Sequence, residues 1–487
     1  MNDGKRTAAG PVPAAEEIHG VIQAVQRAAS AYLARLEEDP VLLGGAEKAA
    51  SRFEGVALPE KGHGAEDALD VLLRDGVAAA TRSSGPRFFH FVTGGTTPAA
   101  LGADWLATVL DQNALAWIGS PLATTLESVS VAWLKDLFGL PPTWGGVLTT
   151  GATMANLVAL ASARRWYGER LGIDVEEQGL AGVPQIPVFS SGYIHPSALK
   201  ALAMLGIGRS NVAALRGDSI GRLDEAALRR ALRELDGRPS IVVANAGEVN
   251  AGDFDPIARM ADLADEYGAW LHVDGAFGLF AAVSPRTELL VDGVTRADSV
   301  IADGHKWLNV PYESGFAFVK ERAYLPGAFS ASAAYLTNPD DPRPSYMYMG
   351  PEMSRRARSL AVWATLYAYG RAGYRSMVER HLDLAQRVAA RVDASVELER
   401  LADVPFNIVC FRFRPPGATE TELDDLNRRL GEAILSDGRV FVGTTVYDGH
   451  VAFRPAFVNW RTSEEDVDGL LDVVVELGHR LMSRPPR

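Results

Sequence analysis

The sequence predicts an α/β fold in which a mainly parallel seven-stranded sheet is flanked by helices on both faces. Between residues 145 and 319, short apolar segments alternate with longer segments of helical periodicity. This alternation is typical of units in which a helix returns the chain so that successive strands run in parallel. An aspartate and a lysine each follow a short apolar segment, and parallel sheets bind ligands at the carboxyl ends of their strands.

The composition indicates a folded protein without a broad cationic surface. The chain has 487 residues, of which 47% are hydrophobic and 22% are charged, and its formal net charge is -13. This acidic balance argues against nucleic acid or an anionic membrane as a partner. No apolar run reaches about 18 residues, so we expect no membrane-spanning helix and a cytoplasmic protein. The single cysteine, Cys410, excludes an intrachain disulfide and a multi-cysteine zinc site, and we expect no metal.

The chain is expected to form an N-terminal helical segment, a large domain and a small C-terminal α+β domain. The N-terminal segment begins with disorder over residues 1–13 and continues with amphipathic helices over residues 14–37 and 65–82. Helices without strands cannot form a core of their own here, so we expect them to pack on another subunit or on the large domain. The expected boundaries are 1–85, 86–375 and 376–487.

Apolar spacing predicts the elements of the large domain. Strands are expected over residues 146–148, 187–190, 212–215, 241–244, 270–273, 300–302 and 315–319. Helices are expected over residues 98–113, 122–138, 155–171, 197–205, 225–235 and 256–267. Residues 326–350 lack periodicity, and a loop of this length is usually functional or disordered.

The rest of the chain alternates helices and strands in the manner of an α+β domain. Helices are expected over residues 352–370, 374–392, 420–436 and 463–482, and strands over residues 407–413, 439–445 and 449–455.

Lys306 lies in a polar cluster directly after the strand expected at 300–302. Burial disfavours a charged ammonium, and a neutral amine is a nucleophile that condenses with an aldehyde. A lone lysine at a strand end more often reaches out to solvent. Here, however, Asp274 ends the strand that precedes it in the chain. A pyridoxal phosphate site requires a lysine that carries the cofactor as a Schiff base and an acid that keeps the ring nitrogen protonated.

Two further segments could complete a cofactor site. The turn at Gly151, Ala152 and Thr153 precedes a helix, and a helix N-terminus with small residues can bind phosphate, although the same pattern is common in packing. His195 precedes another helix and could stack on the cofactor ring, whereas an isolated histidine there would more often cap the helix. Ala276, two residues after Asp274, would point the same way and is small enough to lie under the other ring face.

Taken together, these motifs resemble the group II pyridoxal-dependent decarboxylases, the family of aromatic amino acid, tyrosine and glutamate decarboxylases. The resemblance extends from about Pro86 to the C-terminal helix. It is carried by residues 86–89, Ser120-Pro121 with Glu127, Gly151-Ala152-Thr153, His195, residues 272–276, His305-Lys306-Trp307, residues 354–360, and Arg454-Pro455 with Asn459. The resemblance implies the fold type I of pyridoxal-phosphate-dependent transferases. It also implies a homodimer with sites at the subunit interface and an N-terminal segment that crosses to the partner.

The resemblance also implies roles for individual residues. Lys306 would bind the cofactor covalently, Asp274 would pair with the ring nitrogen, and His195 would stack on the ring. The residues expected at the phosphate are Gly151, Ala152 and Thr153, with His305 and Asp303 near the phosphate or the lysine.

Two positions depart from the family pattern. Asp303 stands where several relatives carry asparagine, and an acid facing the phosphate would repel it unless the acid were turned away. Residues 247–250 read Gly-Glu-Val-Asn where relatives often have Gly-Thr-Thr. No hydroxyl is therefore available there for the cofactor, and Asn250 is the substitute that we consider.

The expected activity is decarboxylation of an L-amino acid to the amine and carbon dioxide. The cofactor ring accepts the electrons left when the bond to the carboxylate breaks. Tyr335, in the long loop, matches the tyrosine that protonates Cα in the family. Substrate-pocket residues placed by resemblance are Phe91, Thr93, Leu115, Trp117, Tyr346 and Tyr348. This set is largely apolar, which favours an aromatic or aliphatic amino acid over glutamate.

Three alternatives remain open on the same residues. A transaminase would need a cation to hold the α-carboxylate, and Arg454 could supply it. An aldehyde synthase that decarboxylates its substrate would normally lack the loop tyrosine, so Tyr335 argues against it. A non-catalytic protein that binds the cofactor is disfavoured by the intact set of Lys306, Asp274 and His195.

Overall fold

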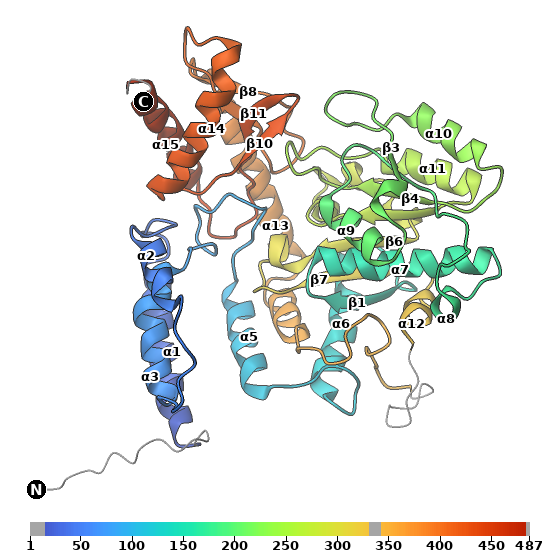
Figure 1. The fold of residues 1–487 in the computed structure, drawn as a ribbon, viewed down its shortest axis with the longest axis horizontal. Helices are drawn as coiled ribbons and strands as arrows, with labels where there is room; N and C mark the ends of the chain where they lie inside the picture. The colour runs from blue at the N-terminus through green and yellow to red at the C-terminus, as the bar shows by residue number, and fades with distance from the viewer. Residues whose placement is uncertain (1–14, 331–341, 484–487) are drawn as a thin grey trace, which may run out of the picture.

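The computed structural model describes residues 15–330 and 342–483 and has the predicted α/β architecture. Figure 1 shows an N-terminal group of helices, a large α/β domain and a C-terminal α+β region. The predicted disorder over residues 1–13 and the loop tyrosine Tyr335 lie outside the described residues. Within the described residues, no helix is long and apolar enough to cross a membrane.

The large domain is built on a seven-stranded sheet with the order β1-β7-β6-β5-β4-β2-β3. The strands are β1 (Gly145–Thr149), β2 (Val188–Ser190), β3 (Val212–Ala214), β4 (Ile241–Asn245), β5 (Trp270–Asp274), β6 (Ser299–Asp303) and β7 (Gly315–Val319). Only β7 runs against its neighbours, pairing antiparallel with both β1 and β6. The prediction of a mainly parallel sheet is therefore confirmed, and β1, β4, β5 and β6 all end at the same edge.

Alternating side chains of each strand enter two apolar cores, one on each face of the sheet. On β4, Ile241 and Val243 belong to one core, whereas Val242 and Ala244 belong to the other. The first face is covered by α7 (Ala152–Arg170), α9 (Pro196–Met204) and α12 (Tyr324–Phe329). The second face is covered by α6 (Pro121–Leu137), α10 (Glu225–Glu234), α11 (Ile257–Tyr267) and part of α13 (Ser359–Ala394).

Helix α13 joins the large domain to the C-terminal region. The two helices expected over residues 352–370 and 374–392 form one element that begins only at Ser359 and is interrupted at Gly370 (φ 57°, ψ -175°). The C-terminal region has a four-stranded antiparallel sheet in the order β10-β11-β9-β8 and its own apolar core. Its elements are β8 (Leu398–Arg400), β9 (Phe411–Phe413), α14 (Glu420–Asp437), β10 (Thr444–Tyr447), β11 (His450–Phe453) and α15 (Glu464–Met482).

Two strands predicted in this region are largely wrong. Of residues 407–413 only the last three form a strand, β9. Of residues 439–445 only the last two enter β10, because Phe441 instead pairs its backbone with Arg87 and Phe89 of the large domain. At Phe441, hydrogen bonds to a segment distant in the sequence therefore replace the pairing within the C-terminal sheet that the local apolar pattern suggested.

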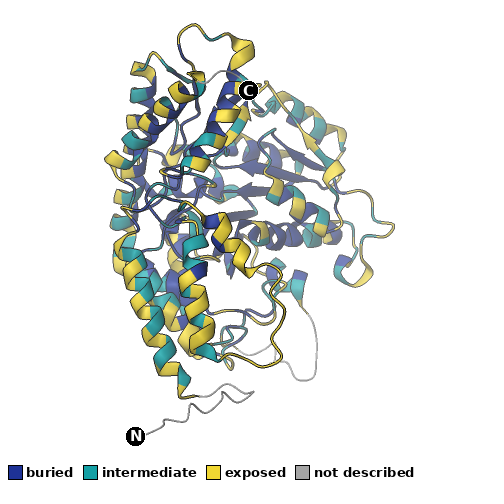
Figure 2. Ribbon diagram, turned by 60° about the vertical axis from the view of Figure 1, so that its left-hand side comes forward, coloured by how far each residue is buried: buried dark blue, intermediate teal, exposed yellow. Residues whose placement is uncertain are grey.

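The N-terminal helices leave much of their apolar surface partly or fully exposed. Helix α1 (Glu17–Ala34) contains no buried residue, and Ile18 and Ile22 are more than half exposed. Figure 2 shows this group as mostly exposed or intermediate, in contrast to the buried sheet. The helix expected over residues 65–82 is divided into α3 (Ala65–Val71), a π-helical turn (Leu72–Gly76) and α4 (Val77–Ala79). Nearby, α5 (Pro98–Leu110) also exposes apolar side chains.

Candidate active site

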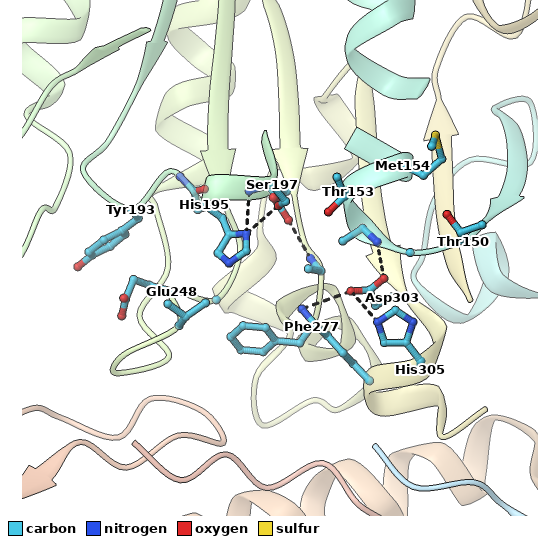
Figure 3. A pocket seen from close by; sticks show the side chains of 18 residues that line it. Thr150, Thr153, Met154, Tyr193, His195, Ser197, Glu248, Phe277, Asp303 and His305 are labelled. Atoms are coloured by element: carbon cyan, nitrogen blue, oxygen red, sulfur yellow. Dashed lines mark hydrogen bonds and ion pairs between the residues drawn. The ribbon is translucent and has the colours of Figure 1, made fainter. Parts of the chain in front are cut away.

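A cavity of about 270 Å³ lies at the edge of the sheet where the parallel strands end. Figure 3 shows that side chains enter it from strand ends and from the N-terminus of α7. Its lining residues are Thr150, Gly151, Ala152, Thr153, Met154, Tyr193, His195, Ser197, Asn245, Gly247, Glu248, Val249, Asp274, Ala276, Phe277, Asp303, His305 and Lys306. Lys306 and Asp274 therefore line the same cavity. This agrees with the expectation that parallel sheets bind ligands at the carboxyl ends of their strands.

Lys306 lies in a tight π-helical turn (Gly304–Leu308) after β6, with an unusual backbone conformation (φ -93°, ψ -106°). Its Nζ atom is 3.3 Å from Asp303 Oδ2 and 5.5 Å from the centre of the Phe277 ring. The segment at Gly94 packs directly on this turn, because the Gly94 N–H donates to the carbonyl of His305 at 3.1 Å. A side chain at position 94 would overlap the Lys306 carbonyl, so only glycine allows this approach.

Asp274 ends β5 and accepts two hydrogen bonds. Asn156 Nδ2 donates to its Oδ2 at 2.9 Å, and the Ala276 N–H donates to its Oδ1 at 3.2 Å. The side chain is 5% exposed and lines the cavity. Both partners are donors, which stabilises a carboxylate and fixes its orientation.

His195 precedes α9 and points into the cavity (Figure 3). Its Nδ1 accepts the backbone N–H of Ser197 at 3.2 Å and lies 2.7 Å from the Ser197 hydroxyl. Because Nδ1 is an acceptor, the ring proton is on Nε2, and desolvation lowers the pKa of His195. The imidazole is therefore neutral and is held by its own helix cap, while Ala276 lines the same cavity.

The phosphate side of the cavity is formed by α7, which begins at Ala152, three residues before the predicted start. Gly151 precedes it in an extended conformation (φ 153°) that only glycine adopts easily. The first residues of α7, Ala152 and Thr153, line the cavity, and Figure 3 shows the Thr153 side chain there. A helix N-terminus of this kind suits a phosphate group.

Asp303 is not turned away from this side. Its Oδ1 accepts the Ala152 N–H at 2.5 Å, and its Oδ2 lies 3.5 Å from His305 Nε2 as well as near Lys306. Burial lowers the pKa of His305, whose ring stacks on Tyr312 with centres 4.3 Å apart. One of the helix donors expected for phosphate is therefore occupied by an acid of the protein.

Asn250 lies outside the residues that line the cavity. Its side chain donates to Glu248 Oε1 and accepts from the Thr445 hydroxyl. Glu248 does line the cavity, but its carboxylate accepts the N–H groups of Asn250 and Ala251, each at 2.8 Å. The turn after β4 is thus closed by its own acid, and the structure offers no contact from Asn250 to a ligand in this cavity.

The six expected substrate-pocket residues also lie outside the lining of this cavity. Thr93 is near it, through a 3.3 Å contact of its hydroxyl with Tyr312 Oη, and Phe91 is 63% exposed. Leu115 and Trp117 instead pair with the segment at residues 344–347. Tyr346 and Tyr348 line a second cavity. One copy of the chain therefore brings the six residues together only in part.

Sequence reasoning missed Asn156 and Phe277, both of which contact the key residues. Asn156 is fully buried in α7, four positions after Ala152 and so one turn along the same face. The available signal was a lone amide in an otherwise apolar run. Phe277 follows Ala276 directly and could be read only as a core residue.

The donor set of the cavity fits pyridoxal 5′-phosphate. An amine (Lys306) and a carboxylate (Asp274) suit the aldehyde and the ring nitrogen, an imidazole (His195) suits a ring face, and a helix N-terminus suits the phosphate. Every requirement is met by a residue that lines the cavity.

Comparisons with known proteins agree with this chemistry. The model of the pyridoxal-dependent decarboxylase conserved domain matches residues 55–414, which include all the lining residues. The chain is 30% identical over 418 residues to an aromatic-L-amino-acid decarboxylase of Bacillus atrophaeus, covering 84% of this chain and 85% of that protein. It is 28% identical over 471 residues to a phenylacetaldehyde synthase of Arabidopsis thaliana, covering 93% and 94%. TDC of Oryza sativa, crystallised with PLP and tryptamine, matches the structure with a TM-score of 0.89 and 25% identity over 98% of this chain and 100% of that one.

Proposed function

Because the chain belongs to the pyridoxal-dependent decarboxylase family, we propose that it converts an L-amino acid with an aromatic or apolar side chain to the corresponding amine. The family establishes pyridoxal 5′-phosphate as the cofactor and carboxy-lyase chemistry as the activity. The observation that carries the proposal is the single cavity lined by Lys306, Asp274 and the N-terminus of α7.

Each lining residue has a proposed task. The bound cofactor supplies an electron-accepting ring that takes up the electron pair of the broken bond to the carboxylate. Lys306 binds the cofactor covalently, and Asp274 holds a proton on the ring nitrogen. His195 covers one ring face and keeps its proton on Nε2, directed away from the Ser197 cap. Tyr335, outside the described residues, is proposed to protonate Cα.

The choice of an aromatic substrate is supported by the relatives and by the expected pocket. The relative from Bacillus atrophaeus is named for aromatic amino acids, and the Oryza sativa structure contains tryptamine. Phe91, Leu115 and Trp117 are apolar side chains without a formal charge. Such a lining favours an apolar ring over a second carboxylate, which would require a desolvated partner.

We also propose that the enzyme is a homodimer whose partner completes the pocket. Leu115 and Trp117 pair with residues 344–347 and do not line the cavity that contains Lys306 in the same chain. In the proposed dimer, the segment at Leu115 and Trp117 of the second copy would complete the cavity of the first. Helix α5 exposes Trp105, Leu106 and Val109 by 42%, 50% and 71%. An apolar groove of about 390 Å³ lies between α1 and α5. Apolar surface of this extent is typical of a protein–protein interface.

A panel of the common L-amino acids, assayed for carbon dioxide and amine, tests the proposed activity. Tyrosine, tryptophan or phenylalanine is expected to give carbon dioxide and amine in equal amounts. Carbon dioxide released only from glutamate or aspartate would contradict the substrate class. No release from any amino acid by the cofactor-loaded enzyme would contradict the activity.

The same panel separates the second candidate function, an aldehyde synthase. The likeness to a phenylacetaldehyde synthase across 93% of the chain favours it. An aldehyde synthase consumes dioxygen and yields aldehyde, ammonia and hydrogen peroxide along with carbon dioxide. Peroxide equal to carbon dioxide would establish that outcome, whereas amine without peroxide supports the decarboxylase.

A further inference from the structure

We propose that Asn156, His272 and Ser299 are positioning residues that orient the carboxylate of Asp274 through a one-directional chain of hydrogen bonds. The inference rests on the proposed function, because it assumes that Asp274 faces the cofactor ring nitrogen. None of the three residues was expected in the site from the sequence, and only Asp274 itself lines the cavity.

The chain of contacts arises from the pleat of β5. Trp270, His272 and Asp274 are at alternate positions, so their side chains point to the same face of the sheet, which α7 covers. Trp270 Nε1 lies 3.0 Å from Ser299 Oγ, and His272 Nδ1 lies 2.9 Å from the same hydroxyl. Ser299 is on the neighbouring strand β6, directly opposite His272.

The chain then continues through α7 to the acid. His272 Nε2 lies 2.8 Å from Asn156 Oδ1, and Asn156 Nδ2 donates to Asp274 Oδ2 at 2.9 Å. Asn156, His272 and Ser299 are each 0% exposed, so bulk solvent does not reach these groups. A buried polar network of this kind is stable only when every member is satisfied.

The direction of each hydrogen bond follows from Trp270, the first member of this network. The Trp270 indole N–H can only donate, so the Ser299 oxygen accepts it and the Ser299 hydroxyl proton goes to His272 Nδ1. His272 then carries its proton on Nε2 and donates to Asn156. The reverse arrangement would place Asn156 Oδ1 against the Asp274 carboxylate, with two acceptors facing each other.

His272 is held neutral in this chain. Desolvation by burial lowers the pKa of His272 to about 4, so near pH 7 the ring has one proton, which the network directs toward Asn156. All four donors therefore point from the interior of the sheet toward Asp274. The backbone N–H of Ala276 holds the other carboxylate oxygen. Together these two donors fix the carboxylate plane and leave its remaining lone pairs for the ring nitrogen.

A double-mutant cycle tests whether Asn156 acts through Asp274. Asn156→Leu keeps the branched shape of the side chain but removes the hydrogen bonds. It is expected to raise the dissociation constant for pyridoxal 5′-phosphate about tenfold, the scale on which loss of a partner that orients a ligating side chain acts at metal sites. Added to Asp274→Asn, the same change is expected to alter that constant less than about twofold, because the acceptor charge is already absent.

Ser162→Ala is the matched control, because Ser162 is buried on α7 but, among the residues that the structure describes, hydrogen-bonds only within its own helix. Ser299→Ala interrupts the chain farther from the acid and is expected to have a smaller effect of the same kind. It also provides the test if Asn156→Leu does not fold, as judged by thermal unfolding of the full chain.

The outcomes separate this inference from the proposed site. If Asp274→Asn binds the cofactor and turns over like the wild type, the assignment of Asp274 is wrong. If Asp274→Asn is impaired but Asn156→Leu and Ser299→Ala behave like Ser162→Ala, the positioning chain is wrong. Equal effects of Asn156→Leu on both backgrounds would show that Asn156 acts independently of Asp274, for example through its 3.3 Å contact with the Ser197 hydroxyl, and would also overturn the inference.

Discussion

Asp303 shows how one residue can oppose the ligand that its neighbours are arranged to bind. Its carboxylate accepts the first N–H of α7 and lies 3.3 Å from Lys306 Nζ. A phosphate at the same helix terminus would meet this charge at close range. This repulsion between the carboxylate and the phosphate is expected to weaken binding of the cofactor.

Asp303→Asn is therefore expected to tighten binding of pyridoxal 5′-phosphate. Removing one unit charge at about 4 Å from another changes the free energy by about 1 kcal/mol in a water-like medium, which is roughly fivefold in affinity. Spectroscopic titration of the full chain measures the constant. Asp298→Asn, at the opposite end of β6, is the matched control and should leave affinity unchanged. Weaker binding by Asp303→Asn would show instead that the acid organises the phosphate turn.

At the scale of elements, strands were predictable where both faces are buried. Each strand of the large sheet was located to within about two residues. Apart from the largely exposed edge strand β3, these strands are covered on both sides and appear as continuous apolar runs. The start of α7 was missed because Gly151 has no capping side chain. Residues 352–358 resemble a helix but are held by Arg355, whose guanidinium pairs with Glu127 at 2.7 Å and donates to the Leu148 carbonyl. Because Glu127 is 228 positions away from Arg355, the sequence around residues 352–358 does not reveal this contact.

The site was predictable to a similar degree and for related reasons. Three site residues could be predicted, because ionisable side chains stand out next to apolar strands and helix starts. Lys306 and Asp274 are at strand ends, and His195 precedes a helix. Asn156 could not be identified, because its function depends on which face of α7 meets β5. Asn250 was assigned by its position in a turn, and the fold of that turn around Glu248 could not be read from the sequence.

His381 joins three elements around the lysine turn. Trp307 Nε1 donates to His381 Nδ1 at 2.8 Å, and His381 Nε2 donates to the Asn459 carbonyl at 2.9 Å. Burial lowers the pKa of His381 to about 3, so the unfolded chain takes up a proton that the folded chain does not. The stability contribution is complete above the ordinary histidine pKa of about 6.5 and is lost as the pH falls from there toward 3.

His381→Gln is expected to reduce the pH dependence of stability. Between pH 7 and pH 5, the free energy of unfolding should fall about 2 kcal/mol less in this variant than in the wild type, since the glutamine does not titrate. Urea unfolding at the two pH values measures the difference. His63→Gln, at an exposed position, serves as the control. The same pH dependence in His381→Gln as in the wild type would contradict the neutral buried imidazole.

At the scale of the whole molecule, the sheet edge provides the cofactor half of the proposed site, and the exposed helices would provide the surface of the proposed dimer. The cofactor half lies within one chain, since the groups expected at the cofactor, with the exception of Asn250, line one cavity. The expected substrate half is divided between Phe91 and Thr93 on one side and Leu115, Trp117 and Tyr346 on the other. The sequence could not predict this division, because it depends on the backbone pairing of Leu115 and Trp117 with residues 344–347, which are distant in the chain.

Trp105→Glu is expected to dissociate the proposed dimer and to abolish decarboxylation together, because the partner would no longer complete the pocket. Trp105 is a partly exposed residue of α5, and a charge there would have to be buried in the interface. Sedimentation velocity measures the mass and the amino acid assay measures activity. Leu289→Glu, at a residue that is 83% exposed in the large domain, should remain dimeric and active. A monomeric wild type with full activity would contradict the shared site.

The covalent attachment of the cofactor to Lys306 is the central claim, and borohydride reduction tests it directly. Reduction of the cofactor-loaded enzyme, followed by proteolysis and mass spectrometry, should locate a phosphopyridoxyl group on the peptide that contains Lys306. Lys306→Ala should carry no such group and should lose the visible absorption of the bound cofactor. A phosphopyridoxyl group on another lysine, such as Lys135, Lys200 or Lys320, with Lys306 unmodified, would contradict the account.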